Sequence, residues 1–339
     1  MKRILVLASI LIFSCSSDPQ NCDILIENGV IYDGTGDKPY KGVVAISNDK
    51  IIYVGKNKNF VADKVIDATD KAVSPGFINM LSWAYNSLMD DGRSLSDLKQ
   101  GVTLEVFGEG TSPGPSGNIK DNSYVSFGEA MQKLEDNGVS PNIASYLGAA
   151  TVRIQEIGYA NRKATDEEME SMREIVKSAM EEGAIGIGSS LIYAPGDYAD
   201  TDELIELSKV ASSYGGRYIS HMRNEDSRIL SAVDELIEIA EKADIPAEIY
   251  HLKASRKANY HLLDSVISRV EEARSKGLKI TADMYTYTAS STGLTGVIPT
   301  WVQEGGREAW INRMKRPDIR KRLFADIRKE LSEQPPEDI

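Results

Sequence analysis

The stretch of sequence that decides the fold reads RYISHMRNEDSRILSAVDELIEIAEKADIPAEIYHLK, residues 217–253. It opens with a short β-rich run, continues as an amphipathic helical pattern and closes with a second β-rich run. A strand, a helix and a strand in this order form a βαβ unit, whose two strands lie parallel in one sheet.

The same alternation extends in both directions along the chain. It predicts seven strands, over residues 72–80, 101–108, 142–147, 184–190, 217–222, 246–252 and 279–287. A capping box, Thr165-Asp166-Glu167-Glu168, opens one helix between them, and Thr201-Asp202-Glu203 opens another. The pattern predicts an α/β fold for residues 71–339, a (β/α)₈ TIM-like barrel with seven of its eight strands present. A doubly wound sheet is the alternative, but no glycine-rich dinucleotide loop follows the first strand.

Residues 23–70 show a different pattern. Short β-rich runs, 24–26, 30–32, 43–46 and 51–55, alternate with turn segments rich in Gly, Asn and Asp. This pattern predicts a small antiparallel β unit ahead of the barrel.

The first fifteen residues have the layout of a secretory signal. Lys2 and Arg3 precede an apolar run, residues 4–13, which is too short to span a bilayer. Because Ile12-Phe13-Ser14-Cys15 resembles a lipobox, we expect residues 1–15 to be a lipoprotein signal peptide and Cys15 to carry the lipid. Residues 16–22 are then a polar tether, and the protein is exported and anchored by lipid, facing the periplasm or the cell surface.

Composition limits the class of partner. The chain has 339 residues, 41% hydrophobic and 27% charged, and a formal net charge of −12. No basic stripe is available to neutralise phosphates, so we expect no nucleic-acid partner. With Cys15 lipidated, Cys22 is the one remaining cysteine, and no disulfide framework can form.

The candidate site lies where two predicted strands end. The chain has three histidines; His221 lies near the end of the fifth strand and His251 near the end of the sixth, whereas His261 begins a helix and is interpreted as a surface or capping residue. A lone strand histidine is more often a core residue, but two at equivalent places on adjacent strands can share one metal ion. A zinc centre usually needs a third protein ligand. Strand alternation puts Glu105 and Glu109 on one face, with Glu109 at the mouth as the candidate and Glu105 in reserve.

Two cations accompany these histidines. Arg223 and Lys253 each lie two residues beyond a histidine, on the same strand face and further towards solvent. In so acidic a chain, two cations near a metal site favour a small substrate that carries a carboxylate.

At these residues the sequence resembles the D-aminoacylase, or N-acyl-D-amino-acid deacylase, branch of the amidohydrolase superfamily. The resemblance also rests on Ser74-Pro75-Gly76-Phe77-Ile78-Asn79, residues 183–198 and Asp283-Met284-Tyr285-Thr286-Tyr287-Thr288-Ala289-Ser290-Ser291. It implies a β-sandwich, of which residues 23–70 are the first part, and a barrel with zinc at the strand ends. It further implies hydrolysis of N-acyl-D-amino acids to a carboxylic acid and a D-amino acid.

The resemblance also implies roles for individual residues. His221 and His251 are implied zinc ligands, and Lys253 and Tyr285 hold the substrate carboxylate. Tyr193 lies against the reacting group, and Ser291 lines the pocket.

Three departures from the family pattern bear on activity. Leu81 and Trp83 stand where the family has a His-x-His pair, so we expect a single zinc ion rather than two. Gly110 stands where the family has a cysteine ligand, which is why Glu109 is the candidate. The general acid/base aspartate of the eighth strand has no counterpart, so we expect an incomplete barrel with exposed sheet edges and weak or absent activity.

Open alternatives are a related deacetylase, D-hydantoinase-like hydrolase or dipeptidase, and a catalytically dead, lipid-anchored binding protein. The oligomeric state stays open.

Overall fold

The structure, a computed structural model, describes residues 18–118 and 122–332. The predicted signal peptide and Cys15 lie outside the described residues. The chain divides into two compact units between Gly76 and Phe77. None of the helices in the described part of the chain combines the length and the apolar character that a bilayer crossing requires.

The N-terminal unit contains two small sheets. Its strands are β1 (Gln20–Glu27), β2 (Val30–Ile31), β3 (Tyr40–Lys41), β4 (Val43–Ser47), β5 (Lys50–Gly55), β6 (Phe60–Asp67) and β7 (Ala72–Val73). The strand orders are β5-β4-β1-β6 and β3-β2-β7. The prediction of a purely antiparallel unit is wrong, because β1 pairs with β6 in parallel and β2 with β7 in parallel.

Two predicted boundaries of this unit also need correction. The predicted tether, 16–22, overlaps β1, and Cys22 is buried against Leu25, Val43 and Ala45. The predicted first barrel strand, 72–80, is two strands: β7 belongs to the N-terminal unit, and β8 (Phe77–Asn79) belongs to the second. Pro75 lies between them and has no N–H for a sheet ladder, so the second unit starts at Phe77 rather than at residue 71.

The second unit carries a parallel strand at each of the seven predicted places. After β8 they are β9 (Val102–Phe107), β10 (Asn142–Ser145) with β11 (Leu147–Gly148), β12 (Gly186–Ser190), β13 (Arg217–His221), β14 (Ala247–Ile249) and β15 (Ile280–Ala282). The orders are β10-β9-β8 and β11-β12-β13-β14-β15. The third predicted strand joins the two sheets, because β10 pairs with β9 and β11 pairs with β12. No strand follows β15 within residues 18–118 and 122–332.

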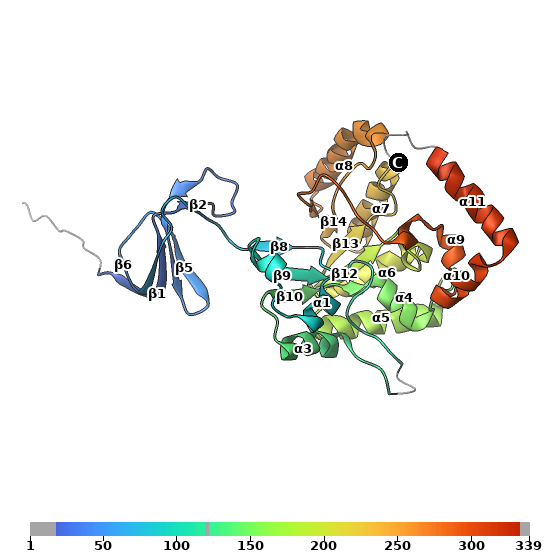
Figure 1. The fold of residues 1–339 in the computed structure, drawn as a ribbon, viewed down its shortest axis with the longest axis horizontal. Coiled ribbons are helices and arrows are strands. Elements are labelled where there is room, and N and C mark those ends of the chain that lie inside the picture. Colours follow the sequence, from blue (N-terminus) through green and yellow to red (C-terminus); the bar gives the residue numbers. More distant parts are fainter. Residues whose placement is uncertain (1–17, 119–121, 333–339) are drawn as a thin grey trace, which may run out of the picture. The chain divides into compact units, whose positions relative to one another are not determined.

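Helices surround these strands (Figure 1). They are α1 (Tyr85–Asp90), α2 (Leu95–Leu98), α3 (Phe127–Asn137), α4 (Ala149–Glu156), α5 (Asp166–Glu181), α6 (Thr201–Ser213), α7 (Ile229–Lys242) and α8 (Leu263–Ser275), followed by α9 (Thr300–Gln303), α10 (Gly306–Met314) and α11 (Pro317–Ser332). The predicted capping box is confirmed at α5, where Thr165 Oγ1 accepts from Glu168 N–H and Glu168 accepts from Thr165 N–H. Short 3₁₀ helices among the described residues include η2 (Gly196–Tyr198), η3 (Lys257–Leu262) and η4 (Leu294–Val297).

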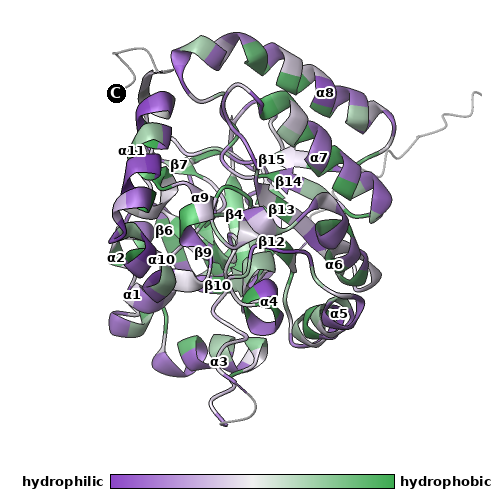
Figure 2. Cartoon of the chain, turned by 90° about the vertical axis from the view of Figure 1, so that its right-hand side faces the viewer, coloured by the Kyte–Doolittle hydropathy of each residue, from purple (hydrophilic) through white to green (hydrophobic). Residues whose placement is uncertain are grey.

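The main core lies between the second sheet and its helices. The buried face of α7 recurs every three or four residues, as an amphipathic helix requires: Ile229, Ala232, Val233, Leu236, Ile239 and Ala240. Figure 2 shows hydrophilic residues on the outward sides of helices of this unit such as α5 and α8. This packing fixes the strands whose carboxyl ends carry the candidate site.

Candidate metal centre

Three predicted side chains meet at the carboxyl ends of the strands. Glu109 follows β9, His221 is the last residue of β13 and His251 follows β14. Because β13 and β14 are hydrogen-bonded neighbours in a parallel sheet, their carboxyl ends bring the two imidazoles to one edge. The positions are not equivalent: the register pairs Ser220 with Ile249, so His251 lies one residue further along its strand than His221. Their ring centroids are 4.5 Å apart and their planes are nearly perpendicular, at 88°.

The ligand atoms of the three side chains converge. Glu109 Oε1 is 2.9 Å from His221 Nδ1 and 3.6 Å from His251 Nε2. One atom from each residue lies within 4.8 Å of the others, and Glu109 and His221 are buried. Two ligands at about 2.1 Å from one tetrahedral ion lie about 3.4 Å apart, and the two separations lie on either side of this value, so they suit zinc. Two nitrogens and one carboxylate oxygen are also a ligand set that zinc commonly takes.

Electrostatics keep the carboxylate of Glu109 ionised. Burial raises the pKa of Glu109, but hydrogen bonds from His221, His251 and Trp83 outweigh burial and lower it to about 2. Burial lowers the pKa of His251, but its contacts with Glu109 and Glu225 outweigh burial and raise it to about 9. At neutral pH the metal-free cluster therefore pairs an ionised Glu109 with a protonated His251, and a bound cation would take the place of that proton.

Trp83 occupies one of the two places where the sequence lacks a His-x-His pair. Its indole Nε1–H donates a 2.7 Å hydrogen bond to Glu109 Oε2, the oxygen that does not face the histidines. Leu81 lies at the other place, packed against the apolar cluster that includes Val106. The tryptophan orients the carboxylate instead of contributing a metal ligand.

Glu225 is a residue that the sequence reasoning missed. Its Oε1 lies 3.0 Å from His251 Nδ1 and accepts a 2.8 Å hydrogen bond from Lys253 Nζ. Burial raises the pKa of Glu225, but its hydrogen bond with His251 and the nearby charges of His221 and Lys253 outweigh burial and lower it. The sequence did hold a signal for Glu225: it lies four residues beyond His221, in the segment that carries the predicted site.

The backbone of His251 is held by the next strand. His251 has φ +37°, which is uncommon for a non-glycine residue, and its N–H donates a 2.6 Å hydrogen bond to Asp283 Oδ1. Burial raises the pKa of Asp283. The aspartate therefore fixes the turn that aims the imidazole.

Three of the predicted substrate residues lie near this cluster: Tyr193, Tyr285 and Lys253. The ring of Tyr193 is 5.4 Å from that of His221, and its hydroxyl is 2.7 Å from Thr292 Oγ1. The ring of Tyr285 is 6.3 Å from that of His251, and Lys253 Nζ lies 5.7 Å from its centroid. Burial raises the pKa of both tyrosines. Ser291 is exposed, in the segment between β15 and η4.

Two other predictions differ from the structure. The guanidinium of Arg223 is bound to the carboxylate of Glu235 on α7 and to the carbonyl oxygens of Asp197 and Ala199. Arg223 therefore connects α7 with the segment around η2, and its guanidinium is already paired rather than available to bind a substrate carboxylate. Glu105, the reserve ligand, is fully buried and accepts hydrogen bonds from Ser82 and Ser94 instead. His261 is exposed, as predicted.

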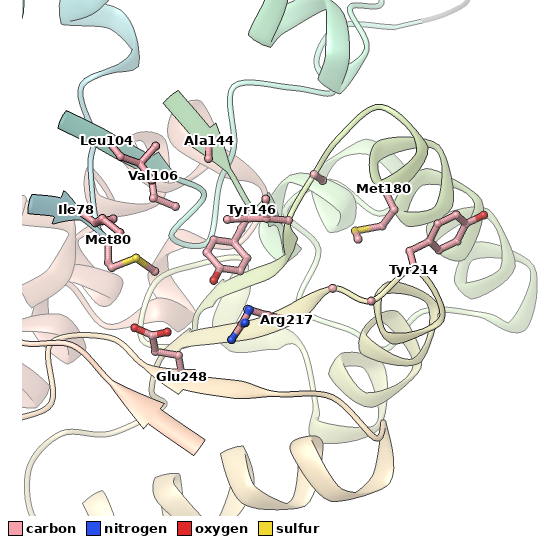
Figure 3. Close-up of a pocket in the computed structure, with 14 residues that line it drawn as sticks. Ile78, Met80, Leu104, Val106, Ala144, Tyr146, Met180, Tyr214, Arg217 and Glu248 are labelled. Atoms are coloured by element: carbon pink, nitrogen blue, oxygen red, sulfur yellow. The ribbon is translucent and has the colours of Figure 1, made fainter. Parts of the chain in front are cut away.

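A cavity lies elsewhere in the second unit. It has a volume of about 580 Å³ and is lined mainly by apolar side chains such as Met80, Leu104 and Val106. Figure 3 shows Arg217 and Glu248 with their polar ends near Tyr146. None of the three clustered residues lines this cavity.

Comparison with known proteins identifies homologues over most of the chain. No protein-family model matches. The D-aminoacylase of Alcaligenes xylosoxydans xylosoxydans is 29% identical over 291 residues, which cover 82% of this chain and 60% of that protein. The N-acyl-D-glutamate deacylase of the same organism is 27% identical over 287 residues, which cover 80% and 58%. The chain thus spans about 60% of the length of these curated relatives.

Solved structures give the same result. A crystal structure of D-aminoacylase, 28% identical, matches with a TM-score of 0.72 over 79% of this chain and 59% of that chain. The N-acyl-D-glutamate deacylase from Bordetella bronchiseptica, complexed with zinc and a phosphonate inhibitor, is 25% identical and matches with a TM-score of 0.71 over the same shares. The chain is therefore a homologue of D-aminoacylase and of the N-acyl-D-glutamate and N-acyl-D-aspartate deacylases, which confirms the resemblance read from its sequence.

Proposed function

We propose that the protein is a zinc-dependent hydrolase that cleaves the amide bond of N-acyl-D-amino acids. The observation that carries this proposal is the convergence of Glu109, His221 and His251 at the strand ends of a deacylase homologue. In the reaction, water adds across the amide: the C–N bond breaks, the carbonyl carbon gains the oxygen and the leaving nitrogen gains a proton. A bound zinc ion supplies Lewis-acid polarisation of the carbonyl and lowers the pKa of water.

The three side chains hold one ion through defined atoms. Glu109 Oε1, His221 Nδ1 and His251 Nε2 face one another, and these atoms are the proposed ligands. Leu81 and Trp83 leave no histidine pair for a second ion, so we propose one zinc per chain.

The surrounding residues bind and orient the substrate. Lys253 Nζ lies within hydrogen-bond distance of Glu225 Oε1, the His251 carbonyl oxygen and His251 Nδ1. Once His251 Nδ1 carries a proton, one N–H of the ammonium group is left to bind the substrate carboxylate, beside the hydroxyl of Tyr285. Burial raises the pKa of Tyr193 further above its ordinary value of 10, which already keeps the hydroxyl protonated at neutral pH, so Tyr193 can donate a hydrogen bond to the oxygen that gains charge. The resemblance also assigns Ser291 to this mouth.

A substrate panel tests this function. The zinc-loaded chain is incubated with matched N-acetyl-D- and N-acetyl-L-amino acids, and both release of free amine and equilibrium binding are measured. We expect turnover or binding that favours the D isomer and disappears in His251→Ala. Equal turnover rates and equal affinities for the D and L isomers overturn the substrate assignment. The absence of both turnover and binding at millimolar concentrations overturns it as well.

We also propose that the chain is exported and lipid-anchored through Cys15. The support is the sequence of residues 1–15, which lie outside the described residues. Expression in a bacterial host with radiolabelled palmitate tests it: the wild type is expected to incorporate label and Cys15→Ser to lose it. Label that persists in Cys15→Ser contradicts the anchor.

A further inference from the structure

The carboxylate of Glu225 lies between the outer nitrogens of both imidazoles. Glu225 Oε1 is 3.0 Å from His251 Nδ1, and Oε2 is 3.7 Å from His221 Nε2. The inner nitrogens, His221 Nδ1 and His251 Nε2, face Glu109 instead. Two carboxylates thus flank the histidine pair, one on the proposed ligand side and one behind it.

The outer nitrogen of His221 needs a partner. His221 Nε2 is buried and makes no hydrogen bond among the described residues. Buried polar atoms in proteins are nearly always paired. Glu225 Oε2 is a carboxylate oxygen already facing this nitrogen, and a side-chain adjustment of less than about 1 Å brings the pair within hydrogen-bond distance.

Glu225 is itself held firmly. Lys253 Nζ donates to its Oε1, and its backbone carbonyl oxygen accepts a 2.7 Å hydrogen bond from Ser255 N–H in the segment that follows β14. Its side chain is only 12% exposed. The residue therefore links the β13 end, which carries His221, to the β14 end, which carries His251.

We propose that Glu225 is a positioning residue that serves both metal-binding histidines. It accepts the Nδ1–H of His251 and the Nε2–H of His221, and so fixes the two rings in opposite tautomers that present Nε2 and Nδ1 to the ion. Lys253 Nζ lies 3.1 Å from the same His251 Nδ1, and it keeps its hydrogen bond to Glu225 Oε1 when that nitrogen carries the proton. Carboxylates that accept the free N–H of a ligand histidine set its tautomer and raise its basicity. This inference rests on the proposed zinc site and names a residue that supports it.

Nitrogen NMR of the zinc-loaded chain tests the tautomers directly. Selective ¹⁵N-histidine labelling gives three imidazoles, and the exposed His261 is an internal reference. We expect the proton on Nε2 of His221 and on Nδ1 of His251. The same tautomer at both residues overturns the inference without any substitution.

Zinc affinity, measured by competition with a chelator, tests the contribution of Glu225. We expect Glu225→Gln to bind zinc about 10- to 100-fold more weakly, because an amide cannot accept from both rings. Glu225→Asp keeps the charge and is expected to lie between Glu225→Gln and the wild type. The matched control is Glu105→Gln, a buried glutamate that binds two serines and no histidine, and its affinity is expected to equal the wild type.

The outcomes separate this inference from the proposed function. Wild-type affinity in folded Glu225→Gln, with unchanged tautomers, overturns the role of Glu225 and leaves the zinc site standing. A wild-type chain that binds no zinc overturns the proposed function, and the inference with it.

Discussion

Trp83 Nε1 lies 2.7 Å from Glu109 Oε2, and it donates its hydrogen bond to the carboxylate oxygen that faces away from His221 and His251. The indole thereby holds the plane of the carboxylate and leaves Oε1 free to face the two imidazoles. Trp83, which is not a proposed metal ligand, therefore sets the orientation of the Glu109 carboxylate, which is one.

Removing this hydrogen bond is expected to weaken zinc binding modestly. Trp83→Phe keeps an aromatic ring but loses the donor, and one hydrogen bond of about 0.5–1.5 kcal/mol corresponds to a roughly two- to tenfold loss of affinity. Trp301→Phe is the matched control, because Trp301 donates to Asp326 in the C-terminal helices. Equal zinc affinity in Trp83→Phe and Trp301→Phe contradicts the orienting role.

Restoring a cysteine at residue 110 is expected to fail. Gly110 has φ +70°, and a Cβ there lies 2.7 Å from Ser190 Cβ. Left-handed backbone costs a side-chain-bearing residue about 1–2 kcal/mol, and the close contact adds to this cost. We expect Gly110→Cys to lower the free energy of unfolding in urea by about 2 kcal/mol or more without raising zinc affinity. Tighter zinc binding with unchanged stability contradicts this account.

The buried ion pair between Arg153 of α4 and Glu203 of α6 is expected to matter for stability and not for the metal. The two side chains are 1% and 6% exposed, and Arg153 also donates to the carbonyl oxygens of Ala160 and Arg162. Arg153→Met leaves a buried carboxylate unpaired and is expected to destabilise the protein by about 3–5 kcal/mol in urea unfolding.

The double variant Arg153→Met/Glu203→Met removes both charges, and we expect it to recover much of that loss. Zinc content is expected to stay at the wild-type level in both variants. A single variant as stable as the wild type contradicts the importance of the pair.

Zinc binding is expected to strengthen with rising pH. In the metal-free protein, His251 has a pKa raised from 6.5 to about 9, so at pH 7 it carries a proton that zinc must displace. Apparent zinc affinity is therefore expected to rise about tenfold per pH unit from pH 7 and to level off near pH 9. Chelator competition across this range measures it. A flat profile contradicts the assignment of His251 as a ligand.

Much of the second unit could be predicted from the sequence, because each βα unit has a local signal. The histidine pair was also predictable, since the carboxyl ends of adjacent parallel strands meet. The sequence did not show that His251 lies one residue further along than His221, at a backbone turn with φ +37°. Glu109 was chosen by strand alternation, yet β9 ends at Phe107 and Gly108 has φ +109°. The alternation therefore does not extend to Glu109, and the turn at Gly108 places it.

The features that escaped prediction depend on contacts distant in sequence or on turns after strands. Arg223 pairs with Glu235, a residue of the following helix. Side chains alternate between the two faces only within a strand, and Arg223 lies beyond the end of β13, so the alternation does not predict its direction. The parallel pairing of β1 with β6 joins segments about forty residues apart, and β6 is largely exposed, so no apolar alternation marks it.

The metal content of purified protein tests the central claim most directly. Mass spectrometry of zinc in the wild type, His221→Ala and His251→Ala is compared after dialysis, with folding checked by circular dichroism. We expect about one zinc per wild-type chain and almost none in either variant, because each variant loses one of three ligands. A wild-type chain without zinc, or folded variants that retain it in full, contradicts the metal centre.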